Sequence, residues 1–368
     1  MRILVAMSGG VDSSVVAGLL TEAGHEVVGA TLQLHDHRGD TPKAGACCAG
    51  RDIDDARRVA DHIGVAHYVI DAEQRFRDSV IADFADSYAR GETPVPCVQC
   101  NRGVKFTDLL GLARELGADA MATGHYVRRR QTEGGIELHR ARDAERDQSW
   151  FLFATTARQL DFLRFPLGEM ADKGIVRAHA DRLGLVVADK PDSQDLCFVP
   201  PGAGYGDLVE TLRPDIAGDG DIVDGDGRRL GRHQGIARYT VGQTRRLGIA
   251  ASVSGARQQV LAIEPATRRI VIGPRDGGSR GGGGRRGWRL RAMNWLVPPP
   301  HAAGLRCAVQ LRAREATRAA SIRATSEGAE LLLDEAALAA PGQACVLYDG
   351  ARVLGGGFLC REPPEQEA

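Results

Sequence analysis

Apolar positions follow two different patterns along this chain. Up to about residue 130, short apolar runs alternate with longer segments in which apolar residues recur at helical spacing. The runs predict strands over 2–7, 26–34, 67–70 and 118–122, and the amphipathic segments predict helices over 13–23, 52–63, 76–88 and 104–116. Because parallel strands need helical crossovers between them, this order predicts an α/β fold with a doubly wound parallel sheet.

After about residue 205 the pattern changes to short strands separated by turns. Gly and Asp are dense between 218 and 227, and Gly281–Gly284 is predicted to be a flexible break. The predicted strands are 259–263, 269–272, 306–311, 330–334, 344–348 and 352–359. We therefore expect a catalytic nucleotide domain over 1–204, a small central domain over 205–278 and a C-terminal β-barrel over 279–368.

The composition limits the class of protein. Of 368 residues, 43% are hydrophobic and 26% are charged, which is typical of a folded globular chain. No apolar run approaches the ~20 residues that span a bilayer, and the first residues lack the features of a signal peptide. Eight cysteines are too few for a disulfide scaffold. We expect a cytoplasmic protein with no membrane partner.

The net charge of −1 hides an uneven distribution. Between Arg268 and Arg323 there are 13 Arg and two acidic residues, Asp276 and Glu315, so this segment carries +11 and the remainder −12. The scarcity of Lys explains the choice of Arg but not the lack of acidic residues. Such a segment predicts a surface that binds a phosphate backbone, while a solvated charged face stays the alternative.

The segment AMSGGVDSS follows the first predicted strand and opens a helix. Gly9 and Gly10 let the backbone approach phosphate, the helix N-terminus adds positive potential, and Ser8 and Ser13 add hydroxyl donors. Asp12 would repel phosphates unless it holds Mg²⁺, and we assign it that role. The form SGGxDS lacks the Lys of the GxxxxGK[ST] loop. It resembles the loop of the ATP-pyrophosphatase (PP-loop) superfamily, in which chemistry occurs at the α-phosphate.

Two cysteine positions indicate chemistry. Cys97 and Cys100 form a CxxC pair after a turn-rich segment, and Cys197 lies in a polar segment. Cys100 precedes a helix predicted to start near Val104, so its thiol is expected to ionise readily. We interpret the later cysteines as small buried hydrophobic residues: Cys307, Cys345 and Cys360.

The chemistry of these cysteines has two interpretations. A structural zinc site commonly uses two CxxC pairs, whereas this chain has one, and Cys47-Cys48 is poorly spaced for one tetrahedral ion. That leaves a sulfur-transferring thiol pair, or an iron–sulfur cluster with three Cys ligands and one open iron.

Further segments follow the loop in a fixed order up to position 350: GETPVPCVQCNRGVKF, ATGHYVRR, RDQSWFL, DSQDLCFVP, GRHQGIARYTVGQTRRLGI and PGQACVLYDG. Together they resemble the bacterial tRNA-specific 2-thiouridylase family (MnmA/TrmU) over nearly the whole chain. The resemblance implies an adenine nucleotide alpha hydrolase-like domain that uses ATP to adenylate the C2 oxygen of the wobble uridine in the tRNA anticodon loop. Sulfur delivered through a sulfur-donor protein then replaces that oxygen, which gives 2-thiouridine, AMP and pyrophosphate.

The resemblance also assigns residues. Cys100 matches the nucleophile of the family and Cys197 its persulfide carrier. Leu32 stands where the family usually has Met, and Ala313 where it commonly has an aromatic residue. The implied ATP-binding residues are Ala6, Met7, Ser8, Gly9, Gly10, Val11, Asp12, Ser13, Leu32 and Gly124. The implied tRNA-binding residues are His125, Arg146, Asp147, Gln148, Arg312, Ala313 and Gln343.

Cys97 departs from the family, in which many members carry an Asp proposed to act as acid or base. With Cys100 and Cys197 it supplies three thiolates, the number that would hold a [4Fe-4S] cluster with one free iron. The sequence leaves open a cluster, a persulfide relay with Cys97 as an auxiliary thiol, and a Cys100–Cys197 disulfide bond. The alternative function is that of another PP-loop adenylating enzyme, which thiolates a different tRNA base. A non-catalytic RNA-binding protein is disfavoured because the loop and thiols are all present.

Overall fold

The computed structural model describes residues 1–35, 48–192, 196–199, 202, 204–249, 257–275, 284–300 and 304–361. Residues Cys47, Ser193–Asp195 and Gly281–Gly283 therefore lie outside the described residues. The chain divides into two compact units. The first unit comprises 1–80, 97–200 and 349–355, and the second comprises 81–96, 201–348 and 356–368.

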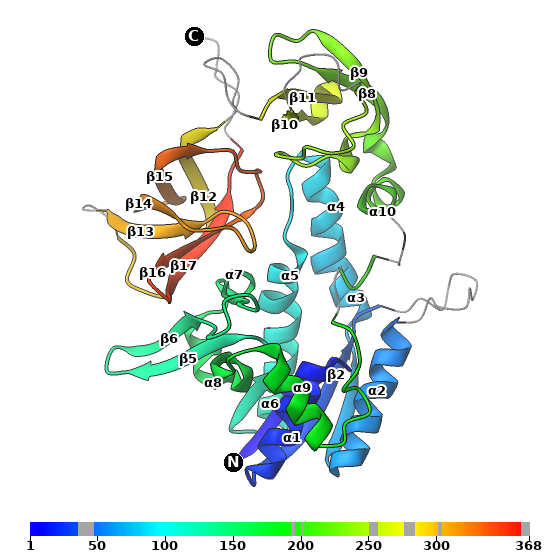
Figure 1. Ribbon diagram of the computed structural model, residues 1–368, viewed down its shortest axis with the longest axis vertical. Helices are drawn as coiled ribbons and strands as arrows, with labels where there is room; N and C mark the ends of the chain where they lie inside the picture. Colours follow the sequence, from blue (N-terminus) through cyan, green and yellow to red (C-terminus); the bar gives the residue numbers. More distant parts are fainter. Residues whose placement is uncertain are drawn as a thin grey trace. The chain divides into compact units, whose positions relative to one another are not determined.

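The first unit is built on a five-stranded sheet in which all strands are parallel (Figure 1). Its order is β3 (Ala66–Asp71), β2 (Glu26–Gln33), β1 (Arg2–Ala6), β4 (Ala120–Thr123) and β7 (Leu163–Arg164). Both neighbours of β1 come later in the chain, so the direction of winding reverses there. This confirms the predicted doubly wound sheet and places a switch point at the carboxyl ends of β1 and β4.

Helices of the first unit connect these strands. They are α1 (Val11–Glu22), α2 (Cys48–Ile63), α3 (Glu73–Phe76), α5 (Pro96–Gln99), α6 (Leu110–Glu115), α7 (Ser149–Leu152), α8 (Ala157–Phe162) and α9 (Lys173–Arg182). Two π-helical stretches, Arg77–Ile81 and Cys100–Leu109, and a 3₁₀ turn at Pro166–Glu169 complete the set. The predicted helix over 76–88 begins earlier, at Glu73, and continues through the first π-helical stretch into α4 (Ala82–Ala89).

The predicted helix start near Val104 is wrong. Helical structure runs from Pro96 to Glu115, because proline fits the first turn of a helix, where its missing N–H costs nothing. Cys97 consequently lies in the first turn. Cys100 lies a turn further along, at the start of a π-helical stretch, where i→i+5 hydrogen bonding widens the helix.

A hairpin that the sequence analysis did not predict follows the switch point. It consists of β5 (Val127–Thr132) and β6 (Gly135–Arg140), and His139 of β6 also pairs with Arg352. Arg128–Arg130 occupy three successive positions of β5, and this run of charge conceals the alternation that identifies a strand.

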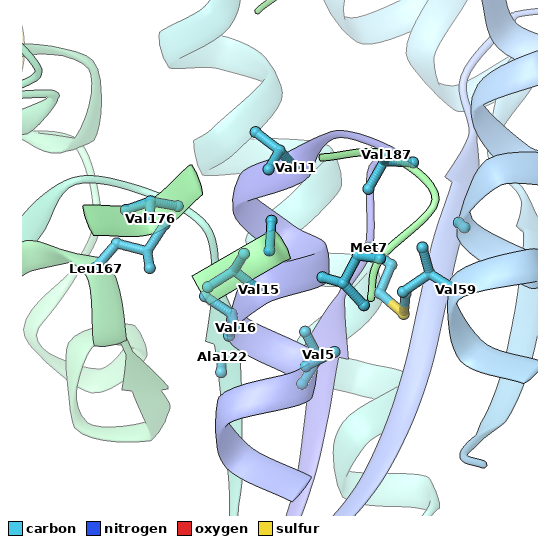
Figure 2. Close-up of a cluster of buried hydrophobic side chains, with 14 of the residues drawn as sticks. Val5, Met7, Val11, Val15, Val16, Val59, Ala122, Leu167, Val176 and Val187 are labelled. Carbon is cyan, nitrogen blue, oxygen red and sulfur yellow. The ribbon is translucent and has the colours of Figure 1, made fainter. Parts of the chain in front are cut away.

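A buried cluster beneath the switch point holds α1 in place. Figure 2 shows Val15 and Val16 of α1 between Val176 of α9 on one side and Met7 with Val59 of α2 on the other. All five side chains are 2% exposed or less. Burying such branched side chains contributes about 1.5–3 kcal/mol each. This packing fixes the N-terminal turns of α1 and α9, where the polar groups of the site lie.

The second unit contains a four-stranded sheet and most of the residues of a barrel. The sheet has the order β10 (Gln258–Glu264), β11 (Arg269–Pro274), β8 (Ala217–Val223) and β9 (Arg229–Gly235), and α10 (Tyr205–Leu212) precedes it. Short 3₁₀ turns lie at Pro214–Ile216, Ile236–Arg238 and Pro265–Thr267. The Gly- and Asp-rich segment therefore divides into a strand, 217–223, and a turn at 224–228 closed by hydrogen bonds between Asp224 and Arg228.

The barrel confirms the predicted C-terminal architecture. Its six strands are β12 (Arg285–Trp295), β13 (Leu305–Gln310), β14 (Arg318–Thr325), β15 (Gly328–Ala337), β16 (Ala344–Asp349) and β17 (Arg352–Leu359). They follow the order β12-β15-β14-β13-β16-β17, and pairing of β12 with β17 closes the barrel. Within the described ranges of the chain, no helix is both long and apolar enough to traverse a bilayer.

Candidate active site

The loop Ser8–Gly10 leaves the carboxyl end of β1 and leads directly into α1. Gly9 has a φ of +70°, and a Cβ there would lie 2.0 Å from the backbone oxygen of Asp52, so only glycine fits. The Ser13 hydroxyl accepts a hydrogen bond from the Ser8 N–H at 3.1 Å and donates one to the Gly10 oxygen at 3.2 Å. The loop is thus held in shape before any nucleotide arrives.

The other predicted ATP-binding residues lie at the same edge of the sheet. Gly124 directly follows β4, and a Cβ at this position would come within 2.8 Å of the Ser13 N and 3.0 Å of the Asp12 carbonyl carbon. Leu32 lies near the carboxyl end of the neighbouring strand β2 and is half-buried. The sheet therefore brings the loop, Leu32 and Gly124 to the edge where open α/β sheets bind ligands.

Asp12 is held by two groups that the sequence analysis did not identify. Its Oδ1 accepts hydrogen bonds from the Tyr126 hydroxyl and from Nζ of Lys173, both at 2.7 Å. Nζ of Lys173 also lies 2.8 Å from Oδ1 of Asp192, and Nη1 of Arg146 donates to Oδ2 of Asp192 at 2.6 Å. Four charged side chains therefore form a chain of alternating sign that starts in the loop.

Tyr126 and Asp192 have displaced pKa values that bear on their roles. Burial, followed by the adjacent Asp12 carboxylate, raises the pKa of Tyr126, so its phenol stays a hydrogen-bond donor. Burial opposes ionisation of Asp192, but hydrogen bonds from Lys173 and Arg146 prevail and hold the pKa of its carboxyl below its usual range. Asp192 is therefore charged at neutral pH.

A second lysine, Lys190, binds the backbone of the loop. Nζ of Lys190 donates to the Gly9 oxygen at 2.9 Å and to the carboxylates of Asp52 and Asp55 at 2.7 and 2.6 Å. Arg58 lies 3.8 Å from Asp55. Among the described residues, the ion pairs joined to the loop thus contain as many cationic as anionic side chains: Asp12, Asp52, Asp55 and Asp192 against Arg58, Arg146, Lys173 and Lys190. A triphosphate would add negative charge to a balanced network.

Asp12 fits the role of a Mg²⁺ ligand. Both of its hydrogen bonds reach Oδ1, so Oδ2 can face a cation. Mg²⁺ at nucleotide sites is commonly held by one or two carboxylates together with phosphate oxygens and water. Such a site needs no larger set of protein ligands, and the described residues contain no group of three or more His, Cys, Asp or Glu that could hold a metal ion.

The three cysteines of interest belong to the same unit as the loop, and all three are free thiols. Cys100 is buried, whereas Cys97 and Cys197 are exposed residues. Surrounding protein raises the pKa of all three thiols, that of Cys197 to about 12, and the Lys105 ammonium lowers each of them. The prediction that Cys100 ionises readily at a helix N-terminus is therefore corrected: its thiol is buried, and burial raises its pKa.

Among the described residues, Lys105 is the cation whose charge lowers the pKa of all three thiols, and the sequence analysis did not single it out. Burial alone would lower the pKa of its ammonium, but the thiolates of Cys100, Cys97 and Cys197 raise it. Cys100 and Lys105 are five residues apart in the π-helical stretch, where i→i+5 bonding places them about one turn apart.

The [4Fe-4S] site at these cysteines stays a prediction. The charges of Cys100 and Cys97 raise the pKa of Cys197, and that of Cys97 raises the pKa of Cys100, so the three thiols lie within electrostatic reach of one another.

The tRNA-binding residues predicted in the first unit make internal contacts. Nδ1 of His125 lies 2.9 Å from Oγ1 of Thr123. Burial, with a contribution from Lys105, lowers the pKa of His125 to about 3, so its ring is neutral. Asp147 accepts hydrogen bonds from the Ala141 N–H, the Ser149 hydroxyl and Arg140, and Gln148 accepts one from the Tyr126 N–H. These contacts shape the loop that carries Arg146 to Asp192.

The remaining predicted tRNA-binding residues lie in the second unit. Nη2 of Arg312 donates to the Val241 oxygen at 3.3 Å, and the absent side chain of Gly242 makes room for this guanidinium. Ala313 follows it and is half-buried. Nε2 of Gln343 donates to the Thr93 oxygen at 3.5 Å.

The barrel strands reduce the charge of the predicted basic segment. Arg306 forms an ion pair with Asp334 at 2.7 Å, and Arg323 lies opposite Glu330 in the β14–β15 ladder and pairs with it at 2.5 Å. Both acidic residues lie outside 268–323, so counting charge along the segment overstated its positive potential.

The fold and the loop define a nucleotide-binding α/β protein extended by a mixed sheet and a closed barrel. Three family models match it: the tRNA methyl transferase HUP domain at 1–201, the tRNA methyl transferase PRC-barrel domain at 209–274 and the aminomethyltransferase beta-barrel domain at 285–359. The chain belongs to the tRNA-specific 2-thiouridylase MnmA family, a family of enzymes.

Relatives that carry that name match over nearly the full length of this chain. The protein of Gluconobacter oxydans (strain 621H) is 66% identical over 360 residues, which cover 98% of this chain and 99% of the relative. The protein of Acidiphilium cryptum (strain JF-5) is 62% identical over 98% of this chain and 100% of its own. Among solved structures, a 4-thiouridine synthetase–RNA complex with bound ATP has a TM-score of 0.36 and 16% identity, covering 58% of this chain and 50% of that one.

Proposed function

We propose that this chain is a tRNA-uridine 2-sulfurtransferase that forms 2-thiouridine at the wobble position of tRNA. The observation that carries the proposal is that an SGGxDS loop and three thiols, whose pKa values one lysine lowers, belong to the same compact unit. The high identity to named 2-thiouridylases over full length supports the same reaction.

The first step activates the base. The backbone N–H groups of Ser8–Ser13 bind the pyrophosphate part of ATP, and Mg²⁺ held by Asp12 would neutralise phosphate charge. The C2 oxygen of uridine attacks the α-phosphorus, a new O–P bond forms, and the bond to pyrophosphate breaks. The C2 oxygen has then become part of a good leaving group.

The second step moves sulfur. A sulfur-donor protein leaves a persulfide on Cys197, and its terminal sulfur attacks C2 of the adenylated base while AMP departs. The Cys100 thiolate then attacks Sγ of Cys197. This breaks the S–S bond, leaves sulfur on the base and forms a Cys100–Cys197 disulfide. A thiol reductant restores both thiols before the next turnover.

Lys105 and Cys97 assist this relay. The Lys105 ammonium favours the thiolate forms that attack and leave, and Cys97 acts as an auxiliary thiol. A cluster on Cys97, Cys100 and Cys197 stays the alternative sulfur carrier, and the relay above is written without it.

We propose three functional domains, over 1–204, 205–278 and 279–368. The tRNA is proposed to contact residues that belong to both compact units. The base enters from a single-stranded anticodon loop, where unstacking costs little. The proposed tRNA contacts are His125, Arg146, Asp147, Gln148, Arg312, Ala313 and Gln343.

In vitro thiolation tests this proposal. The full chain is incubated with unmodified tRNA, ATP, Mg²⁺, a thiol reductant and a sulfur-donor protein that carries a persulfide, and nucleosides are identified by mass spectrometry. We expect 2-thiouridine and AMP in equal amounts. Cys100→Ser should abolish thiolation and leave tRNA binding intact, while Cys360→Ser, a control far from the loop in sequence, should act as the wild type. A different thiolated base would favour the alternative PP-loop enzyme, and unchanged thiolation in Cys100→Ser would overturn the relay.

A further inference from the structure

Lys173 occupies a position that disfavours an ammonium group. It is the first residue of α9, after the N-cap Asp172, and its side chain is 10% exposed. Burial removes the hydration of its charge, and the N-terminus of a helix carries positive potential. Hydrophobic packing gives no reason for a lysine here.

The ammonium is held at the nucleotide loop by charged partners. Its Nζ lies 2.7 Å from Oδ1 of Asp12 and 2.8 Å from Oδ1 of Asp192. It also lies 5.8 Å from the centre of the Tyr126 ring. Val176, one turn further along α9, packs against α1 in the buried cluster and fixes the distance between the two helices (Figure 2).

This placement supplies what the loop sequence lacks. An SGGxDS loop has no lysine of its own for phosphate, and the ion pairs around it are balanced before nucleotide binds. An ammonium has three donors, and the two carboxylates of Asp12 and Asp192 use two of them. Within the described part of the chain, the ammonium has no further hydrogen-bond acceptor, which leaves its third donor for an oxygen atom at the loop.

We propose that Lys173 is a phosphate-binding residue of this site, with its ammonium donating a hydrogen bond to a phosphate oxygen of the nucleotide. Asp192 and Tyr126 are positioning residues: Asp192 forms an ion pair with Nζ of Lys173, and Tyr126 donates to the same Oδ1 of Asp12 that Nζ does. The inference rests on the proposed function only in taking an adenine nucleotide as the ligand.

Affinity measurements with two ligands test this role. Binding of ATP and of adenosine to the full chain, with Mg²⁺, is measured by calorimetry for the wild type and Lys173→Met. Because a hydrogen bond to a charged group contributes about 1.5–3 kcal/mol, ATP affinity should fall at least about tenfold. Adenosine, which lacks phosphate, should bind within about twofold of wild type.

Controls separate phosphate binding from folding. Arg182→Met changes an exposed cation at the other end of α9 and should bind both ligands as the wild type does. Among the ion pairs of the described residues, Arg182 pairs with Glu22 alone. A double variant, Lys173→Met with Asp192→Asn, removes the stranded carboxylate and should still show the selective loss of ATP. Equal losses of ATP and adenosine, or undiminished ATP binding in either Lys173 variant, would overturn the inference.

The same variants distinguish this inference from the proposed function. A wild-type chain that binds ATP through Lys173 but yields no 2-thiouridine contradicts the function and supports the phosphate contact. A Lys173→Met variant that thiolates tRNA with the wild-type KM for ATP supports the function and overturns the contact.

Discussion

A Cβ atom at Gly9 would lie 2.0 Å from the backbone oxygen of Asp52, on the first part of α2. Lys190 closes the arrangement, because its Nζ bonds both the Gly9 oxygen and the Asp52 carboxylate. The loop and helix α2 therefore contact each other through backbone atoms, so neither can shift without a cost in folding free energy.

Gly9→Ala should consequently destabilise the fold and abolish ATP binding. The φ of +70° is strained for alanine, and the new methyl group meets backbone, so we expect a loss of about 1–3 kcal/mol or more in the free energy of unfolding. Urea denaturation measures the loss. Gly10→Ala is the matched control for stability, because its φ is −94° and its Cβ would lie 3.7 Å from the nearest atom. Equal stability of the two variants would show that the contact is relieved easily.

The loop was predictable because its chemistry is local. Ser8, Gly9, Asp12 and Ser13 are neighbours in sequence, and a strand before them and a helix after them follow from apolar spacing. The parallel sheet was predictable for the same reason. Its alternating runs are long and apolar, and such crossovers leave few topologies.

Lys173 was not predictable in this way. It stands 161 residues from Asp12 in the chain, and only the packing of α9 on α1 brings the two together. A single lysine at a helix start has no pattern that distinguishes it from a surface residue. Strands β12 and β14 were missed because Arg and small Ala residues weaken their apolar alternation, although Trp288, Leu290 and Ile322 are buried.

Lys105 should set the reactivity of the thiols. Its ammonium lowers the pKa values of Cys100 and Cys197, so Lys105→Met should raise both and slow alkylation at neutral pH. The pH profile of iodoacetamide labelling, read residue by residue by mass spectrometry, should move to higher pH. Arg102→Met, an exposed cation on the same helix, should leave the profile in place. A profile unmoved by Lys105→Met would remove this lysine from the relay.

His125 should make folding stability depend on pH in the acidic range. Its folded pKa of about 3 lies below the unfolded value of about 6.5, so the unfolded state binds a proton that the folded state refuses. Its contribution is complete above pH 6.5 and is lost as pH falls toward 3, at about 1.4 kcal/mol per pH unit. Urea denaturation across pH 4–7 should therefore show a shallower loss for His125→Gln than for wild type. Parallel curves would mean that the ring is protonated in the folded protein.

The barrel arginines should differ in their contributions to tRNA binding. Arg314 is exposed and forms no ion pair within the described residues, whereas Arg323 is paired with Glu330. If the barrel contacts the phosphate backbone, tRNA affinity should fall steeply with salt, and Arg314→Gln should reduce the slope of log K against log salt by about one. Arg323→Gln should change that slope less, because its charge is already compensated by a carboxylate.

Filter binding between 50 and 300 mM salt, roughly the range in which counterion release dominates, measures both slopes. A flat salt response of the wild type would take the barrel out of the interface.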